Sequence, residues 1–205
     1  MADGIATAVR PYGPRAAIVD CPSELVIPLA AALQATGMFN ELVPAELSVL
    51  VTWAPGISLD DLQGVLDTID VSGAAAVGRL VEIPTVYDGP DLQEVAGITG
   101  LSVDEVVRLH SETTYLAAFA GFAPGFMYCT GLHDALRIPR RPSPRPSVPK
   151  GSVAIADVYT AVYPVSTPGG WSLLGHTDVE MFDVSAAEPA RIRPGDRVRF
   201  IARNS

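Results

Sequence analysis

Hydrophobic and polar positions recur with two different periods over residues 1–88, and each period predicts a different kind of element. Residues 16–20 (AAIVD) and 46–53 (ELSVLVTW) are short, Val-rich runs of the kind that forms strands. Ser58 precedes a run with helical spacing, so we expect an N-capped helix over residues 58–70. The apolar face of this helix consists of Leu59, Leu62, Val65, Leu66 and Ile69.

A second helix is expected over residues 23–37, with Ser23 as its N-cap and Gly37 at its end. Pro28 falls within this span. Because proline lacks a backbone N–H, the helix either starts nearer Ile27 or is kinked.

Residues 78–88 (GRLVEIPTVYD) are expected to form a strand that Pro84 breaks or confines to a sheet edge. The alternation of strands and helices up to this point predicts a small α/β sandwich domain over residues 1–88. Residues 89–205 are expected to form a second domain, which is described below. Together the two predicted domains give the chain an α+β fold class.

Residues 90–112 are expected to form two short helices separated by a glycine turn at residues 97–100. Ser102 and Glu105 have the spacing of a capping box at the start of the second helix. The pair also resembles a helix-turn-helix, but its second helix would carry only Arg108 as a basic residue. That charge does not suit a DNA groove, so we interpret the two helices as leading into the second domain.

From Thr113 onward, short apolar runs alternate with Gly- and Pro-containing turns, which is typical of an all-β barrel or sandwich. Within the last predicted strand, Val198 and Phe200 face one way and the neighbouring arginines face the other. The expected strands are SVAIA (152–156), TAVYPV (160–165), WSLLGHT (171–177), VEMFDV (179–184), ARI (190–192) and DRVRFIA (196–202).

Composition narrows the function. The 205 residues carry a formal net charge of −9, with three Arg against thirteen acids in residues 1–100. An acidic protein is repelled by phosphate backbones, so nucleic acid is not an expected partner. The apolar runs are too short for a membrane span, no signal sequence is seen, and Cys21 and Cys129 form no disulfide framework. We therefore expect no membrane partner and a cytoplasmic location.

The sequence contains no phosphate-binding loop, dinucleotide fingerprint, C-x-x-C pair or H-E-x-x-H helix. Its three histidines are too scattered to indicate a metal site. No catalytic residue can be assigned from these patterns, and three segments remain as candidates for chemistry.

The first segment, FAGFAPGFMYCTGL at residues 119–132, combines glycines with aromatic side chains. Glycine allows the backbone to approach a ligand or another segment closely. The segment is either a buried turn into the barrel or the wall of a pocket or interface. In the second case, Phe122 and Phe126 would form the pocket wall.

The second segment, IPRRPSPRPSVPKGS at residues 138–152, is rich in proline and therefore extended. It is either a surface linker or a stiff frame that holds Arg145 and Lys150 over a carboxylate or phosphate. Arginine suits a bidentate grip on a carboxylate, whereas lysine supplies a point charge.

The third segment, YTAVYPVSTPGGWSLLGHT at residues 159–177, carries hydroxyl groups, consecutive glycines and a large aromatic side chain. It is either a hairpin turn capped by a core tryptophan or a binding loop. In a binding loop, the N–H groups of Gly169 and Gly170 would converge on an anion. The other candidate binding residues here are Tyr163, Ser166, Thr167, Trp171 and His176.

Together these segments resemble the family of the 5-oxoprolinase B subunit, also called allophanate hydrolase subunit 1, which includes the sporulation-kinase inhibitor KipI. The resemblance spans roughly residues 15–203 and is strongest from residue 87. The pieces that carry it, in family order, are YDGPDLQEVAGITGLSVDEVVRLHSE, GFAPGF, PRRPSPRPSVPKGSVAIA, YPVSTPGGWSLLGHT, FD at 182–183 and RPGDRVRF.

The resemblance implies an N-terminal α/β domain followed by a C-terminal cyclophilin-like β-barrel. It also implies a hetero-oligomer with a sister C subunit, itself of cyclophilin-like build, and with a separate A subunit. That complex is a hydrolase that cleaves 5-oxoproline, a lactam, to glutamate using ATP, and its ATP site need not lie on this chain. The isolated chain is expected to be inactive.

In this chemistry, phosphorylation of the amide oxygen makes the ring carbon electrophilic, and water then opens the ring. Arg145 would hold the substrate carboxylate or phosphate, and the Gly169 and Gly170 amides would stabilise developing negative charge. Tyr163 and the hydroxyls of the third segment would hydrogen-bond the substrate.

The chain departs from the family at this candidate site. Lys150 stands where a small residue is usual, and His176 stands where Arg is usual. Asp157, Tyr159 and Ala161 replace Gly, Gln and Gly. These changes leave the exact substrate open.

Two other functions are compatible with the same resemblance. Related domains of urea amidolyase transfer a carboxyl group from carboxybiotin, so carboxyl transfer or hydrolysis in urea or allophanate metabolism is one alternative. Lys150 is the only lysine and lies in no biotin motif, so a partner would have to supply biotin. The other alternative is a binding protein that inhibits a histidine kinase.

Overall fold

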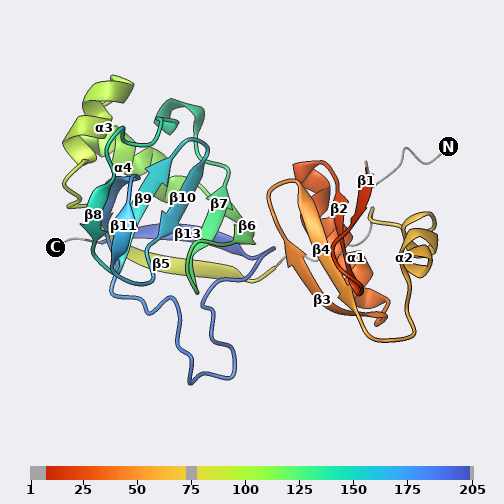
Figure 1. The fold of residues 1–205 in the computed structure, drawn as a ribbon. Helices are drawn as coiled ribbons and strands as arrows, with labels where there is room; N and C mark the ends of the chain where they lie inside the picture. The colour runs from red at the N-terminus through yellow and green to blue at the C-terminus, as the bar shows by residue number, and fades with distance from the viewer. Residues whose placement is uncertain (1–7, 73–77, 204–205) are drawn as a thin grey trace. The chain divides into compact units, whose positions relative to one another are not determined.

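The computed structural model describes residues 8–72 and 78–203, and the chain divides into two compact units, residues 1–77 and 78–205 (Figure 1). Each unit has its own hydrophobic core. The first unit combines helices with a sheet and the second contains a closed barrel, so the predicted α+β fold class is confirmed. Within the described ranges, no helix is both long and apolar enough to cross a membrane.

The first unit is a four-stranded antiparallel sheet with two helices on one face (Figure 1). The sheet order is β1-β2-β4-β3, and the strands are Ala8–Pro11 (β1), Ala16–Asp20 (β2), Phe39–Pro44 (β3) and Ser48–Trp53 (β4). The helices are Ser23–Ala35 (α1) and Leu59–Leu66 (α2). Alternation along β2 and β4 turns one set of side chains toward leucines of both helices. That buried set is Ala17, Val19, Val49, Val51 and Trp53.

The helix boundaries in this unit follow the predicted signals at Ser58, which caps α2, and at Gly37, which follows α1 with φ +67°. The prediction of Ser23 as N-cap was wrong, because Pro22 occupies that position and Ser23 is the first helical residue. Pro28 lies inside α1 and does not delay the start of the helix.

The second unit is a closed barrel with the strand order β10-β7-β6-β13-β5-β12-β9. All neighbouring strands are antiparallel except β5 and β13, which run parallel. β8 and β11 form a separate two-stranded sheet. The strands are Leu80–Val86 (β5), Tyr115–Ala120 (β6), Met127–Thr130 (β7), Arg145–Val148 (β8), Ser152–Ala156 (β9), Tyr159–Val162 (β10), Thr167–Gly169 (β11), Ser172–His176 (β12) and Arg197–Arg203 (β13).

β5 belongs to the barrel, so the boundary between the compact units falls at 77/78 rather than at the expected 88/89. All seven residues of β5 pair with β13, which supplies the hydrogen bonds that a lone strand would lack. Pro84 does not break the strand. On its other side β5 pairs with β12 only at Val86, so Pro84 interrupts few backbone hydrogen bonds there.

The two predicted leading helices are Leu92–Thr99 (α3) and Val103–Glu112 (α4). Gly100 separates them in a left-handed conformation, and Ser102 and Glu105 form the predicted capping box. Both helices pack on the barrel core through apolar side chains. Those side chains are Leu92, Val95, Ala96 and Val106.

The predicted strands at 179–184 and 190–192 were wrong. These residues form a loop with one isolated bridge between Phe182 and Ala190. The Asp183 carboxylate accepts hydrogen bonds from the Ser185 backbone N–H and hydroxyl, and this local turn ends the extended run.

His110 lies fully buried inside the barrel unit and is held as a neutral ring. The Tyr87 hydroxyl lies 2.7 Å from its Nδ1, and Thr160 Oγ1 lies 2.8 Å from its Nε2. Thr160 donates to the carbonyl of Ala154, so its oxygen accepts from Nε2–H while Tyr87 donates to Nδ1. Burial lowers the pKa of His110 to about 3.

Acidification is expected to destabilise the barrel through His110. Its pKa is about 3 in the folded chain and near 6.5 when unfolded, so its contribution is complete above pH 6.5 and is lost as the pH falls toward 3. The melting temperature of His110→Gln should therefore depend less on pH between 7 and 4 than that of the wild type. The exposed His133→Gln variant is the control and should keep the wild-type slope; a wild-type slope in His110→Gln would contradict the assignment.

Gly175→Ala is expected to lower the free energy of unfolding by about 2 kcal/mol or more. The added Cβ would lie 2.1 Å from the carbonyl oxygen of Val86, across the β12–β5 contact. Gly64→Ala in α2 is the matched control, since no described atom lies within 4 Å of its Cβ and alanine favours a helix by about 0.5–1 kcal/mol. Urea denaturation should show opposite signs for the two variants, and equal stabilities would count against the close contact.

Candidate functional site

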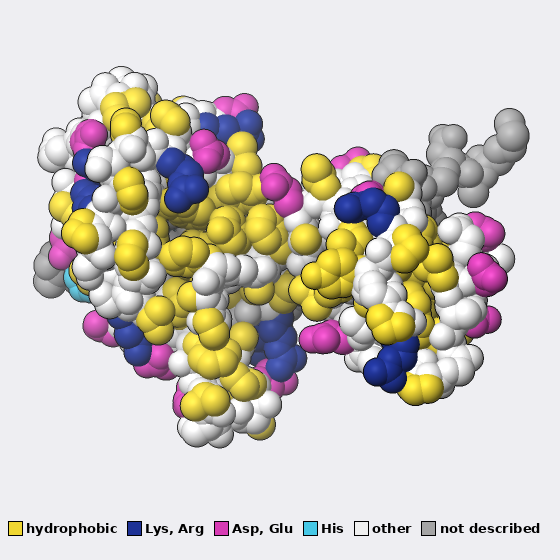
Figure 2. Space-filling view, viewed as in Figure 1, with side chains coloured by type: hydrophobic (Ala, Val, Ile, Leu, Met, Phe, Trp, Pro, Cys, Tyr) yellow, Lys and Arg dark blue, Asp and Glu magenta, His cyan; other side chains and the backbone are white. Residues whose placement is uncertain are grey.

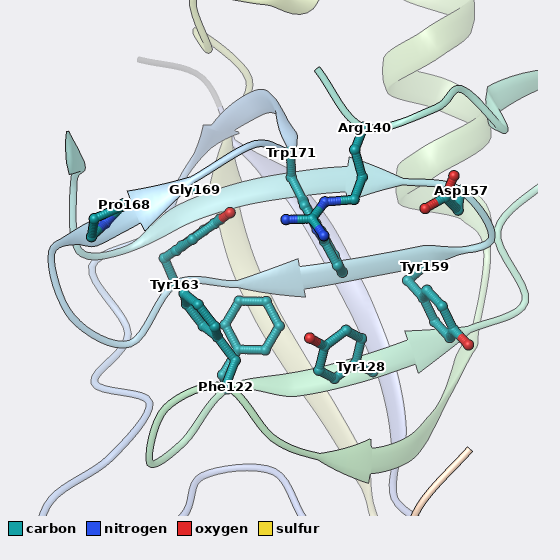
Figure 3. A pocket seen from close by; sticks show the side chains of 10 residues that line it. Phe122, Tyr128, Arg140, Asp157, Tyr159, Tyr163, Pro168, Gly169 and Trp171 are labelled. Atoms are coloured by element: carbon teal, nitrogen blue, oxygen red, sulfur yellow. The ribbon is translucent and has the colours of Figure 1, made fainter. Parts of the chain in front are cut away.

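A pocket of about 220 Å³ opens on the barrel unit, and segments far apart in the sequence build its walls (Figure 3). Pro168 and Gly169 lie at one end of the view, Asp157 and Tyr159 at the other, and Arg140 and Trp171 between them. The lining residues are Phe122, Phe126, Tyr128, Arg140, Asp157, Tyr159, Tyr163, Pro168, Gly169 and Trp171.

The glycine-rich aromatic segment forms the β6–β7 hairpin and supplies Phe122 and Phe126 to the pocket. The Gly121 N–H donates to the carbonyl of Phe126 (3.2 Å) and closes the turn. Gly125 has φ +82°, and a Cβ there would lie 2.7 Å from the Cβ of Phe182. The glycines therefore serve a tight turn with a close neighbour, and the segment's aromatic rings form a pocket wall.

Phe126 is the centre of the aromatic wall and is 2% exposed. Its ring packs edge-to-face on Phe122, Tyr128, Tyr163 and Trp171, with centroid separations of 5.1–5.5 Å. In Figure 2, hydrophobic side chains gather on the barrel unit over β7, β9 and β10. The wall offers flat apolar surface to a small ligand.

Arg140 is the cation of the pocket, and backbone hydrogen bonds fix the segment that carries it. Two residues earlier, the carbonyl of Ile138 accepts from the N–H of Asp157 (2.7 Å). One residue later, the N–H of Arg141 donates to the carbonyl of Gly170 (2.8 Å). Arg140 is thus held between the β9–β10 turn and the residue before Trp171, and its side chain extends into the pocket (Figure 3).

Asp91 is a buried carboxylate that anchors the rest of the proline-rich segment. It accepts hydrogen bonds from the Leu173 N–H (2.7 Å), from Arg141 Nη1 (3.0 Å) and from Arg145 Nη2 (2.5 Å). Arg145, which the sequence analysis assigned to a ligand carboxylate or phosphate, is therefore bound to an internal carboxylate. It is not among the residues that line the pocket.

Tyr163 and Gly169 meet at the other end of the pocket. A Cβ on Gly169 would lie 2.4 Å from the Tyr163 hydroxyl oxygen, so only glycine fits there without rearrangement. Burial raises the pKa of Tyr163. A hydrogen bond from the backbone N–H of Trp171 and the positive charges of Arg140 and Arg145 act in the opposite direction but do not outweigh burial. The phenol is therefore protonated at neutral pH.

Of the predicted site residues, the structure brings Phe122, Phe126, Tyr163, Gly169 and Trp171 together in the pocket. The other six lie outside its lining. They are Arg145, Lys150, Ser166, Thr167, Gly170 and His176.

Besides Arg145, three of those six have side-chain partners elsewhere on the barrel unit. Lys150 Nζ pairs with Glu180 (2.6 Å), and the Ser166 hydroxyl bonds that of Ser147 (2.9 Å). His176 Nδ1 lies 2.8 Å from Asp88, beside a different cavity.

Five lining residues were not predicted as site residues, for three different reasons. Arg140 belongs to a basic run over residues 137–150, and the sequence could not tell which of its arginines Asp91 would bind. The run consists of Arg137, Arg140, Arg141, Arg145 and Lys150. Asp157 and Tyr159 were recognised only as departures from the family pattern. Tyr128 and Pro168 sit beside predicted residues, with no pattern of their own to single them out.

Cys129 is 1% exposed, and burial raises the pKa of its thiol to about 12, so it is no nucleophile. Among the residues that the structure describes, no cluster of three or more His, Cys, Asp or Glu side chains is placed to hold a metal ion. The chemistry of the pocket rests on one arginine, one carboxylate and phenol hydroxyls.

Comparison with known proteins relates the chain to carboxyltransferase-type domains. A family model described as carboxyltransferase domain, subdomain C and D, matches residues 7–192. The B subunit of 5-oxoprolinase from Escherichia coli O157:H7 is 52% identical over 126 residues, which cover 60% of this chain and 58% of that protein. The chain thus spans less than two thirds of the length of this relative.

Two solved structures share the fold. The crystal structure of TTHA0988 is 36% identical with a TM-score of 0.81, over 93% of this chain and 40% of that one. The K. lactis urea amidolyase is 14% identical with a TM-score of 0.63, over 97% of this chain and 16% of that one. At that identity the second comparison concerns the fold alone.

Asp91→Asn is expected to lower the free energy of unfolding by about 2–3 kcal/mol, because it leaves two partly buried guanidinium groups without their shared charge. Glu94→Gln is the control: Glu94 is exposed and, among the described residues, pairs with Arg141 alone, so the loss should stay below about 1 kcal/mol. Urea denaturation measures both, and equal losses would mean that Asp91 is not the anchor.

Proposed function

Because this chain belongs to the family of carboxyltransferase domains, subdomain C and D, we propose that it is one component of an ATP-dependent amidohydrolase complex that cleaves 5-oxoproline to glutamate. The observation that carries the proposal is a pocket with one arginine among aromatic walls, in a chain 52% identical to a 5-oxoprolinase B subunit. That relative is named as one subunit of 5-oxoprolinase, so we propose that other components, a sister C subunit and an A subunit, complete the activity.

The pocket suits a small ring that bears a carboxylate. A guanidinium group binds a carboxylate with two parallel hydrogen bonds, and Arg140 has no described carboxylate as an ion-pair partner. The aromatic side chains that line the pocket, including the exposed Phe122 and the half-buried Tyr128, offer contact to the ring. The hydroxyl of Tyr163, which is protonated at neutral pH, supports hydrogen bonding to the ligand at the Gly169 end of the pocket.

ATP does not fit this pocket. Its volume of about 220 Å³ lies below the usual range of about 300–1,000 Å³ for larger ligands, and it offers one cation where a triphosphate requires several donors. We therefore place the ATP site outside this pocket and propose that another component of the complex supplies it. This chain's part is to hold and orient the lactam. After phosphoryl transfer to the amide oxygen, water attacks the ring carbon and the ring nitrogen leaves as the amine; a second water then releases phosphate from the resulting acyl phosphate to give glutamate.

A second candidate function is carboxyl transfer. The name of the matching family favours it, and so does the same arginine, which would bind a carboxylated amide as readily as a lactam acid. This function requires biotin from a partner, because Lys150 is the chain's only lysine.

Co-expression with the neighbouring genes, followed by assays on 5-oxoproline, allophanate and urea, tests both functions. We expect the purified complex to convert 5-oxoproline to glutamate with ATP, and the isolated chain to be inactive. Arg140→Ala should lower kcat/KM by about a hundredfold, since it removes the charged partner of the carboxylate.

Arg108→Ala is the matched control, because the ion pair that Arg108 forms within the described part of the chain is an exposed one with Glu112 on α4. It should leave the rate unchanged. Turnover of urea or allophanate in place of 5-oxoproline would select the second candidate, and turnover by the isolated chain would refute the need for partners.

A further inference from the structure

Backbone strain in the described chain is concentrated at the pocket. Among residues 8–72 and 78–203, Phe122 (φ +66°) and Asp157 (φ +51°) are the two non-glycine residues with a left-handed backbone. Both line the same pocket. Such conformations cost about 1–3 kcal/mol and persist where the surrounding structure holds them, which is common at ligand sites.

The turn accepts an aspartate at residue 157 but does not require a carboxylate. Asp157 follows β9, and Tyr159 pairs with Ala156 across a two-residue hairpin loop. Glycine, asparagine and aspartate adopt the positive φ of such a loop most easily, and a glycine would serve the turn without adding a charge. The aspartate side chain is exposed and lines the pocket, so its charge is available to a ligand.

Arg140 and Asp157 supply opposite charges to one small cavity. Within the described part of the chain, neither forms an ion pair, with each other or with any other side chain. Their backbones are tied together, because the Asp157 N–H donates to the carbonyl of Ile138 (2.7 Å), two residues before Arg140. A cation and an anion that line one aromatic pocket match a ligand with an acidic end and a hydrogen-bond donor.

We propose that Asp157 is a specificity-determining residue: its carboxylate accepts a hydrogen bond from an N–H group of a ligand whose own carboxylate is bound by Arg140. The ligand class is a small cyclic or planar amide acid with a free N–H. This inference rests on the proposed function, and it names the group by which the site distinguishes a lactam from other ring acids.

A matched pair of ring acids tests the inference. 5-Oxoproline carries the ring N–H, and the lactone 5-oxotetrahydrofuran-2-carboxylate replaces that N–H with oxygen at nearly the same shape. Calorimetric titration of the full chain, alone and in the co-expressed complex, should give about tenfold or greater preference for the lactam. The ratio should fall to about one in Asp157→Gly.

Two further measurements separate specificity from folding. Glycine tolerates φ +51°, so Asp157→Gly should melt no lower than the wild type. Arg140→Gln should weaken both compounds by a similar factor and keep their ratio.

The outcomes distinguish the inference from the proposed function. An unchanged lactam preference in a folded Asp157→Gly variant would overturn the role of Asp157 and leave the pocket as a substrate site. Failure of both compounds to bind the chain and the complex would overturn the proposed function and the inference with it.

Discussion

The barrel unit depends on one buried carboxylate, Asp91, because three separate segments meet at its oxygens. Helix α3 begins beside it, the proline-rich segment reaches it through Arg141 and Arg145, and β12 donates the Leu173 N–H. A buried charge is tolerated only when it is paired and hydrogen-bonded, so the Asp91 carboxylate requires the contacts that all three segments supply. By binding Arg141 and Arg145, Asp91 also leaves Arg140 as the member of the basic run that lines the pocket.

The site therefore combines a rigid charged frame with an aromatic wall. Phe126 lies at the centre of that wall, and close backbone approach at Gly125 and Gly169 holds its neighbours in place. Proline reduces the number of backbone conformations that the Arg140 segment can adopt. The hydrogen bonds at Ile138 and Arg141 stabilise one of them. Little reorganisation is needed when a ligand enters a site built in this way.

Sequence patterns predicted the elements that local physics determines. The N-cap at Ser58, the capping box at Ser102, the glycine turn between α3 and α4, and the α+β class follow from spacing and conformational preference. Contacts between residues far apart in the sequence could not be predicted. Nothing local to residues 80–86 says that their partner lies over a hundred residues later, and nothing in a run of five cations says which of them an internal aspartate will bind. The same limit explains why the aromatic wall was anticipated from Phe122 and Phe126, whereas Arg140 and Asp157 were not.

The parallel pairing of β5 with β13 also constrains how the barrel unit forms. The first and last strands of the closed barrel lie side by side, with Leu80 opposite Arg197. The barrel therefore cannot close until about 120 further residues have been synthesised, and contacts between segments so far apart in the chain form slowly. During that interval β5 presents an unpaired apolar edge, a state in which a nascent chain is open to aggregation or to chaperone binding. The first unit contains no such long-range strand pair among its described strands, so it can complete its sheet while the barrel is still being made.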